Sequence, residues 1–273
     1  MGSSNGLKNS LMKFSIITPT HKRKDKLTRA VTSLLTQTYT DWEMIIINDS
    51  PYDETYKEFA SSINDARIHY HVNSKNNGVN YSRNHALDKL SADSKWIIFL
   101  DDDDYLAPDT LATFHELILL HSNQRWFVTN RAYRHGESIT KFPHDDMLYS
   151  YVWQYLILKR CKGDATHCIE TKLITHIHAH FSRHVKQGEE WFFFCQIGLH
   201  SKMFYHDHNS TISDGYSIDQ GLNFRKRSMS EQIETISKLL YEGKQSSLFY
   251  SFSFFAYIGL RILRIPYSLL HKV

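Results

Sequence analysis

Residues 96–104 read WIIFLDDDD, an apolar run that ends directly in four aspartates. An uninterrupted apolar run of this length fits a strand that is buried on both faces of a sheet. Adjacent carboxylates repel one another, so they need either full solvation or a divalent cation. A solvated acidic turn is the alternative. The position directly after a buried strand favours a binding site, because α/β sheets bind ligands where their strands end.

Strand and helix patterns alternate on both sides of this run. Buried or alternating strand patterns separated by helical spacings predict an α/β sheet that is mostly parallel, with helices packed on it. The strand patterns lie at 14–18, 42–47, 68–72 and 127–130, and the helical patterns at 27–35, 56–63, 82–90, 111–120, 149–158 and 190–199. Residues 133–147 read as a polar loop.

Composition and missing motifs exclude several classes of protein. The 273 residues are 41% hydrophobic and 22% charged, which is typical of a globular chain. The net charge of +3 is too small to indicate nucleic-acid binding. The three cysteines lack a C-x-x-C spacing, which indicates reduced cytosolic thiols. An EF-hand counted from Asp101 would need Gly and Glu where Leu106 and Ala112 stand. No P-loop or G-x-G-x-x-G is present, so a nucleotide would be held by carboxylates, metal and other side chains.

Five short motifs in a fixed order carry a family resemblance. They are SIITPT at 15–20, SLLTQTYTDWE at 33–43, INDS at 47–50, NGVNYSRNHA at 77–86 and FLDDDDYLAPD at 99–109. Together they resemble the inverting GT-A glycosyltransferases of family 2, which include bacterial polysaccharide and lipopolysaccharide sugar transferases. The second half of the chain resembles the family only through GEEWFF at 188–193. The resemblance implies a GT-A fold with a mixed, mainly parallel sheet. It also implies transfer of a hexose-type sugar from a UDP-sugar, with inversion and with Mn²⁺ or Mg²⁺.

The resemblance also implies roles on the donor side. Asp49 corresponds to the aspartate that accepts hydrogen bonds from uracil, and Arg83 to an arginine near the base and the diphosphate. Asp103 is expected to bind the metal ion directly. The remaining donor-binding residues are Thr18 and Thr20, which touch the nucleotide, and Asp101 and Asp102, one or the other of which holds the ribose.

The expected catalytic base on the acceptor side comes from one pair of acidic residues. Inversion needs a carboxylate that removes the proton of the attacking hydroxyl. The pair Glu189-Glu190, before Trp191, matches the family's acid pair, with Glu190 as the expected base and Glu189 as the second choice. A solvated helix N-terminus is the alternative, since acidic residues are favoured there. Of the 17 histidines, His208 is the expected further metal ligand, with His206 as the other choice.

The chain divides into four parts. Residues 1–10 begin MGSSN and read as a tag or a disordered segment. Residues 11–125 are expected to bind the nucleotide sugar, residues 126–215 the acceptor, and residues 216–273 to form a helical, membrane-associating extension. The sequence has no run of 18 or more uncharged apolar residues, so no simple membrane span is predicted.

The pattern at 248–264 predicts an amphipathic helix. Phe252 and Leu263 fall on a broad apolar side, and Tyr257 and Arg261 on a narrow polar stripe. Such a helix suits the membrane interface, with its arginines toward anionic lipid. We therefore expect a cytoplasmic protein on the inner face of the cell membrane, acting on a saccharide or lipid-linked acceptor in surface polysaccharide synthesis. Packing of this helix on the domain or in a homodimer is the alternative.

Two other functions remain open from the sequence. An inactive sugar- or membrane-binding module could share the fold, although Asp49, Arg83, Asp103 and Glu190 are all present. A nucleotidyltransferase could use the same aspartates, but it would normally carry a phosphate-binding loop rich in glycine and lysine.

Overall fold

The central sheet is mixed, and most of its strands run in one direction. The computed structural model describes residues 12–213, 228–246, 248 and 251–270, with side chains as far as Leu263. The tag or disordered segment expected at 1–10 lies outside these residues. The nine strands of the described sheet follow the order β3-β2-β1-β4-β8-β6-β9-β5, with β7 paired to β9. They are β1 (Lys13–Thr20), β2 (Trp42–Asn48), β3 (Ile68–Val72), β4 (Ser94–Phe99), β5 (Asp104–Leu106), β6 (Trp126–Tyr133), β7 (Met147–Tyr149), β8 (Ala165–Glu170) and β9 (Met203–Ser213).

Strand pairing confirms the predicted sheet. Strands β3, β2, β1 and β4 pair in parallel, and β6 and β9 share their direction. The strands that run the other way are β5, β7 and β8. Because β1, β2 and β4 are adjacent and parallel, their carboxyl ends meet at one edge of the sheet.

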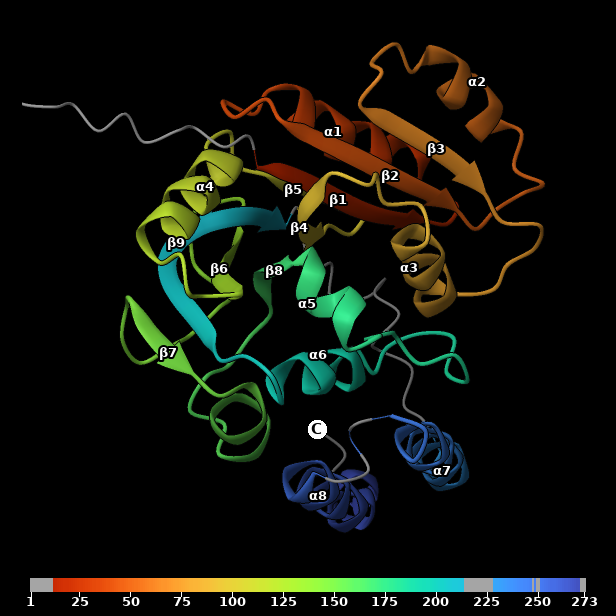
Figure 1. Cartoon of the computed structure of the whole chain (residues 1–273). Helices are drawn as coiled ribbons and strands as arrows, with labels where there is room; N and C mark the ends of the chain where they lie inside the picture. Colours follow the sequence, from red (N-terminus) through yellow and green to blue (C-terminus); the bar gives the residue numbers. More distant parts are fainter. Residues whose placement is uncertain (1–11, 214–227, 247, 249–250, 271–273) are drawn as a thin grey trace, which may run out of the picture.

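Helices cover both faces of the sheet (Figure 1). Alternate residues of a strand point to opposite faces, so Ile16 joins the core under one set of helices and Ile17 the core under the other. The first face is covered by α1 (Lys24–Leu35), α2 (Thr55–Ser62) and α4 (Thr110–Leu120). The second is covered by α3 (Val79–Leu87), the π-helical segment η1 (Tyr151–Ile157), α5 (Thr171–His176) and α6 (Trp191–Gly198).

The sequence reasoning missed the short strands β5 and β7 and the longer strands β8 and β9. Strand β8 reads ATHCIE and β9 begins MFYHDHNS, so polar and histidine residues interrupt both. Strand β8 lies between β4 and β6 and is antiparallel to both. The formation of such a strand depends more on pairing with its neighbouring strands, which are distant in sequence, than on its own hydrophobic periodicity.

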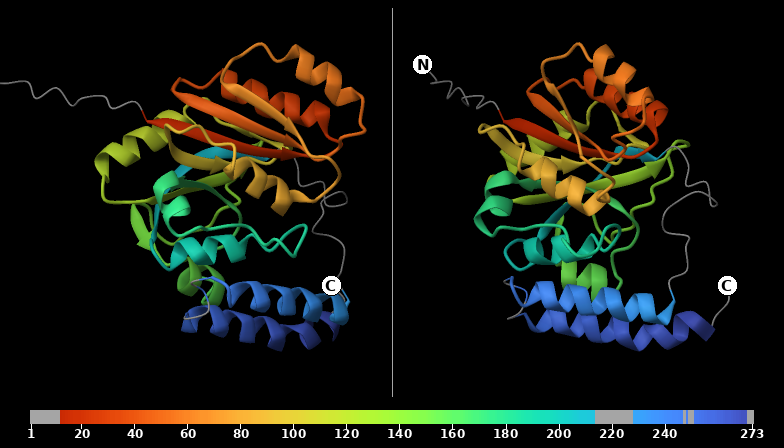
Figure 2. Two further views of the ribbon diagram at one scale, coloured as in Figure 1. Left: turned by 45° about the vertical axis from the view of Figure 1, so that its right-hand side comes forward. Right: turned by 90° about the vertical axis from the view of Figure 1, so that its right-hand side faces the viewer.

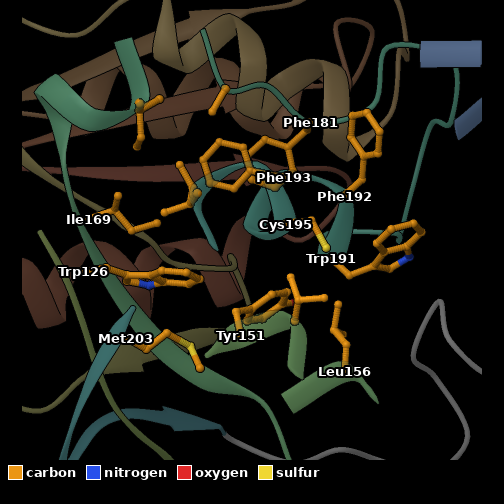
Figure 3. Close-up of a cluster of buried hydrophobic side chains, with 14 of the residues drawn as sticks. Trp126, Tyr151, Leu156, Ile169, Phe181, Trp191, Phe192, Phe193, Cys195 and Met203 are labelled. Atoms are coloured by element: carbon orange, nitrogen blue, oxygen red, sulfur yellow. The ribbon is translucent and has the colours of Figure 1, made fainter. Parts of the chain in front are cut away.

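Two C-terminal helices pack side by side below η1 and α6 (Figure 2). They are α7 (Met229–Gly243) and α8 (Phe252–Leu270), and they confirm the predicted helical extension. A capping box between Ser228 and Glu231 begins α7. Both helices contribute buried side chains to the hydrophobic core under the second face of the sheet, and part of this core is drawn in Figure 3. These side chains are Ile236 and Leu239 of α7, and Phe254, Tyr257 and Ile258 of α8.

The orientation of α8 differs from the expectation. Tyr257 is buried and Arg261 is largely so, which places the predicted polar stripe against the domain. Part of the apolar side faces outward, with Phe252 78% and Leu263 75% exposed, whereas Phe254 and Ile258 of that side are buried together with Tyr257. The physical reason is that both polar residues find partners inside, since Arg261 pairs with Glu189 and Tyr257 packs on Trp191. Among the described residues, no helix is both long and apolar enough to cross a membrane.

A buried carboxylate fastens α7 to the loop before α6. Glu242 accepts hydrogen bonds from the Ser182 hydroxyl at 2.6 Å and the Arg183 amide at 2.8 Å, and it lies 3.3 Å from His180. Burial alone would raise the pKa of Glu242, but the bonds from His180, Ser182 and Arg183 outweigh burial and lower it. The charged form of Glu242 is therefore the form that stabilises this contact.

Replacing Glu242 by glutamine should lower the free energy of unfolding by about 1–3 kcal/mol, because a buried set of charge-assisted hydrogen bonds loses its acceptor. The pKa of Glu242 is lowered in the folded state, so this contribution is complete above its ordinary value of 4.5 and is lost at lower pH. Urea unfolding at pH 7 and across pH 5 to 3 measures both effects. Glu234→Gln, on the exposed side of α7, is the control and should change stability by less than about 0.5 kcal/mol. Equal losses in the two variants would contradict this prediction.

Candidate active site

The candidate site lies at the carboxyl edge of the parallel strands. Thr20 ends β1, Asp49 follows β2, and the aspartates 101–104 follow β4. Strand β1 pairs with both β2 and β4, so residues that are about 30 to 80 positions apart in sequence become neighbours. The predicted position of the aspartate cluster is therefore confirmed.

The four aspartates do not share one environment. They form a turn closed by the Asp104 amide, which donates to the Asp101 carbonyl at 3.1 Å. This turn brings carboxylate oxygens of Asp101, Asp103 and Asp104 within 4.8 Å of one another. Asp102 points elsewhere and accepts a 2.8 Å hydrogen bond from the Thr20 hydroxyl. Three carboxylates with oxygen atoms this close form a donor set that suits Mg²⁺ or Mn²⁺.

Three arginines from separate elements balance the aspartates. Arg23 lies 2.8 Å from Asp103, Arg83 lies 2.8 Å from Asp101, and Arg131 pairs with Asp104. Burial alone would raise the pKa of Asp101, but the charges of Arg83, Arg131 and Arg23, with the hydrogen bond from Arg83, together outweigh it and the pKa falls. Asp101 is therefore held as a carboxylate.

The two buried aspartates of the turn, Asp102 and Asp104, resist ionisation. Burial raises the pKa of Asp102 to about 6 and the pKa of Asp104 to about 7, despite hydrogen bonds from Thr20 and Ser213. Ionising the carboxylates of this turn therefore costs free energy. A divalent cation beside Asp101, Asp103 and Asp104 would lower that cost. The residues present fit such an ion.

The structure does not bring His208 to the three carboxylates. Its ring lies 2.8 Å from the Ser210 hydroxyl and 3.3 Å from Asp109, at the start of α4. His206 forms a separate, exposed group with Asp145 and Asp146. Among the described residues, the group around Asp103 is built from carboxylates alone.

Asp49 is buried and organises the start of α3. Its carboxylate accepts hydrogen bonds from the Asn73 side chain at 2.8 Å, the Asn77 amide at 2.9 Å and the Gly78 amide at 2.7 Å. Gly78 has φ +92°, and a Cβ there would lie 2.4 Å from the Lys186 carbonyl, so glycine is required. The buried hydroxyl of Thr18 finds no hydrogen-bond partner among the described residues. Asp49 and Thr18 are therefore candidates for contacts with the nucleotide.

Arg83 joins the aspartate turn to the acidic pair. Its guanidinium is buried and lies 2.8 Å from Asp101 and 3.0 Å from Glu190. Burial alone would lower the pKa of Arg83, but the charges of Asp101 and Glu190 outweigh it and raise the pKa. A permanently charged arginine thus links two acids that lie 89 residues apart in sequence (190 − 101).

The two glutamates of the acidic pair differ in accessibility. The Glu190 side chain is 42% exposed beside Arg83, so an incoming hydroxyl can reach its carboxylate. The Glu189 side chain is only 6% exposed and is bound by Arg261 and by the Trp191 indole. The geometry therefore favours Glu190 over Glu189 as the proton acceptor.

Sequence reasoning missed four residues that shape the site. Arg23 lies beyond the first-strand motif, and Arg131 lies on β6, outside all five motifs. Asp104 belongs to the aspartate run but was given no role. Arg261 was assigned to the outward polar stripe of the predicted C-terminal helix. Charge balance was the available signal, since four adjacent aspartates require cations nearby, but nothing in the sequence indicates which arginines supply them.

Solved structures share this fold. The crystal structure of S. aureus TarS in complex with UDP-GlcNAc superposes with a TM-score of 0.72 at 18% identity, covering 94% of this chain and 72% of that one. At this identity the similarity shows the fold alone, and it confirms the expected GT-A architecture.

Curated relatives match part of the chain. The putative colanic acid biosynthesis glycosyl transferase WcaA of Escherichia coli is 38% identical over 111 residues, covering 40% of this chain and 38% of the relative. The GalNAc(5)-diNAcBac-PP-undecaprenol beta-1,3-glucosyltransferase of Campylobacter jejuni is 36% identical over 104 residues, covering 37% and 33%. The match thus spans well under half of these relatives. The profile of glycosyl transferase family 2 matches residues 15–180, which is more than half of the chain, and the chain therefore belongs to that family.

Proposed function

We propose that this protein transfers a hexose-type sugar from a UDP-sugar to a hydroxyl group, with inversion at the sugar carbon. The acceptor is a saccharide or a lipid-linked saccharide. The observation that carries the proposal is the Arg83 bridge, which places an accessible carboxylate, Glu190, beside the aspartate turn. The aspartate turn, on one side of Arg83, suits a nucleoside diphosphate and its cation. Glu190, on the other side, suits the role of proton acceptor.

Residues 11–125 bind the donor in this proposal. Asp49 accepts hydrogen bonds from the uracil, and Thr18 and Thr20 contact the nucleotide. Asp101 or Asp102 holds the ribose. Asp101, Asp103 and Asp104 would hold Mn²⁺ or Mg²⁺, which would supply positive charge toward the diphosphate. Arg83 contributes a further positive charge toward the diphosphate. His208 stays a weaker candidate as a ligand, because its ring faces Asp109 and Ser210.

Glu190 acts as the general base in this proposal. Its carboxylate takes the proton of the acceptor hydroxyl as that oxygen attacks the sugar carbon from the face opposite the diphosphate. One bond to carbon forms while the bond to the diphosphate oxygen breaks, which inverts the configuration. Residues 126–215 shape the acceptor side, because Glu190 and the α6 helix belong to that part of the chain.

The names of the relatives support the substrate classes. The TarS structure contains UDP-GlcNAc, and the C. jejuni relative is named for glucosyl transfer and for a saccharide linked to PP-undecaprenol. The WcaA relative is named for colanic acid biosynthesis. We accordingly place this chain in bacterial surface polysaccharide or lipopolysaccharide synthesis.

A screen of UDP-sugars tests the proposal. Purified protein is incubated with each UDP-sugar, with Mn²⁺ or Mg²⁺ and with saccharide or undecaprenyl-linked acceptors, and released UDP and the glycosylated product are measured. We expect one UDP-sugar to give product of inverted configuration. UDP binding without release of UDP from any sugar would favour the inactive binding module. Release of pyrophosphate from a sugar phosphate and UTP would favour the nucleotidyltransferase.

The outward face of α8 supports a membrane-associated position. Phe252, Phe255, Ile262 and Leu263 are exposed on this helix, and the exposed Trp153 of η1 lies beside Phe252 with ring centroids 6.5 Å apart. A contiguous apolar surface of this kind favours either a membrane interface or another protein. We propose peripheral binding to the inner face of the cell membrane, where a lipid-linked acceptor would be found. A homodimer through the same face is the alternative.

Replacing both Phe252 and Leu263 by serine should weaken binding to anionic vesicles about 10-fold or more, because burying each side chain is worth about 1.5–3 kcal/mol. Vesicle co-sedimentation measures this change, and UDP calorimetry should stay unaltered. These surface changes replace truncation of the helix, which would also remove the buried Phe254, Tyr257 and Ile258. Leu120→Ser, on α4 across the sheet and 76% exposed, is the control. Unchanged vesicle binding, with a dimer lost in analytical ultracentrifugation, would favour the homodimer.

A further inference from the structure

The carboxylate of Glu189 is held by the C-terminal helix. Arg261 of α8 pairs with both oxygens, with the Nη2–Oε1 contact at 3.1 Å, and the Trp191 indole donates to the same carboxylate. Burial alone would lower the pKa of Arg261, but the hydrogen bond and charge of Glu189 outweigh it and raise the pKa. Residue 189 therefore stays in an ion pair that links segments 72 residues apart.

The residue on the other side of Glu190 is also held by α8. The Tyr257 ring packs edge-on against Trp191 at 4.8 Å between centroids, and the Arg261 guanidinium lies 5.3 Å from the centre of the Trp191 ring. Phe254 lies against the same ring at 6.2 Å. Both sequence neighbours of the proposed base thus take their positions from one helix.

The backbone beside Glu190 adopts a conformation that its surroundings must maintain. Gly188 has φ +70° and Glu189 has φ +64°, and a glutamate rarely adopts this left-handed region. On the α3 side, the Asn80 side-chain Nδ2 donates to the carbonyls of Val185 at 2.8 Å and Gly188 at 2.9 Å. The segment that carries Glu190 is therefore held between α3 and α8.

We propose that Arg261 is a positioning residue for the proposed base, and this inference rests on the function proposed above. By holding Glu189 and Trp191, Arg261 sets where the Glu190 carboxylate stands relative to Arg83 and the acceptor. Arg261 does not touch substrate, so its loss should affect the proton-transfer step and leave nucleotide binding intact. A planar guanidinium that binds both carboxylate oxygens is needed, and lysine offers only a single point of charge.

Replacing Arg261 by glutamine should lower kcat about 10–100-fold, the loss expected when a catalytic group shifts by about 1 Å. The affinity for UDP, measured by calorimetry, and the KM for the donor should change less than about 2-fold. Arg261→Lys should recover only part of kcat. Glu189→Gln should lower kcat to a similar extent, and the double variant Arg261→Gln/Glu189→Gln should be no slower than either single one, because both changes break the same pair.

A stability control separates positioning from weakened packing. Leu239→Ala removes a buried side chain of α7 in the same core. It should lower Tm at least as much as Arg261→Gln while kcat of the folded fraction stays near that of the unmodified protein. Normal kcat in Arg261→Gln, or multiplied losses in the double variant, would overturn the inference.

Failure of the proposed function would look different. In that case the unmodified protein would transfer no sugar, and hydrogen–deuterium exchange would replace kcat as the measurement. Positioning predicts faster exchange at the amides of residues 189–194 in Arg261→Gln than in Leu239→Ala at equal Tm. Equal exchange in the two variants would overturn the role of Arg261 whether or not the protein is a transferase.

Discussion

Replacing Asp103 by alanine should lower kcat about 10³-fold or more, while the protein stays folded. Loss of a carboxylate that binds the cation costs several kcal/mol of transition-state stabilisation, and each 1.36 kcal/mol is a factor of ten in rate. Asp103 is one of the three clustered carboxylates and is the most exposed partner of Arg23, at 34% of its side chain, so its removal disturbs little packing. The cost should therefore fall on catalysis and not on stability.

The measurement combines kinetics with metal titration. Calorimetry should show that Mn²⁺ strengthens UDP binding to the unmodified protein and not to Asp103→Ala, and chelator should stop turnover of the unmodified protein. Asp145→Ala is the matched control, because it removes an exposed acid from the separate group with His206. A folded Asp103→Ala protein with normal activity in excess chelator would contradict the metal-dependent reaction.

Replacing Glu190 by glutamine should lower kcat about 10²–10⁴-fold, the usual range for loss of a general base. Glutamine keeps the size of the side chain and can still approach Arg83, but it cannot accept the hydroxyl proton. UDP affinity should change little, because Glu190 lies across Arg83 from the aspartate turn. Steady-state kinetics with the best donor and acceptor, together with UDP calorimetry, measure the two effects.

Glu189→Gln is the comparison that identifies the base. If Glu190 takes the proton, Glu190→Gln should lower kcat further than Glu189→Gln does. Glu189→Gln should be slower than the unmodified protein but should still transfer sugar. Normal transfer by Glu190→Gln and no transfer by Glu189→Gln would show that the catalytic role belongs to Glu189.

Sequence patterns were sufficient for the donor half of the molecule. Strands β1, β2 and β4 each contain a short apolar run, and their candidate functional residues lie at the end of β1 and in the loops that directly follow β2 and β4. Because parallel strands end at one edge, Asp49 and the aspartate turn could be placed together before the structure was known. The resemblance to family 2 was confirmed through the same motifs.

Beyond residue 125 the sequence was less informative. Strands β8 and β9 have mixed composition and are defined by pairing with distant strands, so periodicity did not find them. The arginines that balance the aspartates are also distant, since Arg131 reaches Asp104 from β6 and Arg23 reaches Asp103 from the start of α1. Such contacts depend on how the chain is folded and leave no local pattern.

The sequence alone determined the fold class, the edge that carries the site and the aspartates that form it, because short-range hydrophobic periodicity and strand-end loops encode these features. The tertiary structure was needed to distinguish Glu190 from Glu189 and to orient α8. The helix pattern placed Arg261 on an outward polar stripe, whereas in the fold a buried carboxylate 72 positions away is its partner. An amphipathic pattern indicates that a helix has two different sides, but the partners available in the folded chain decide which side turns inward.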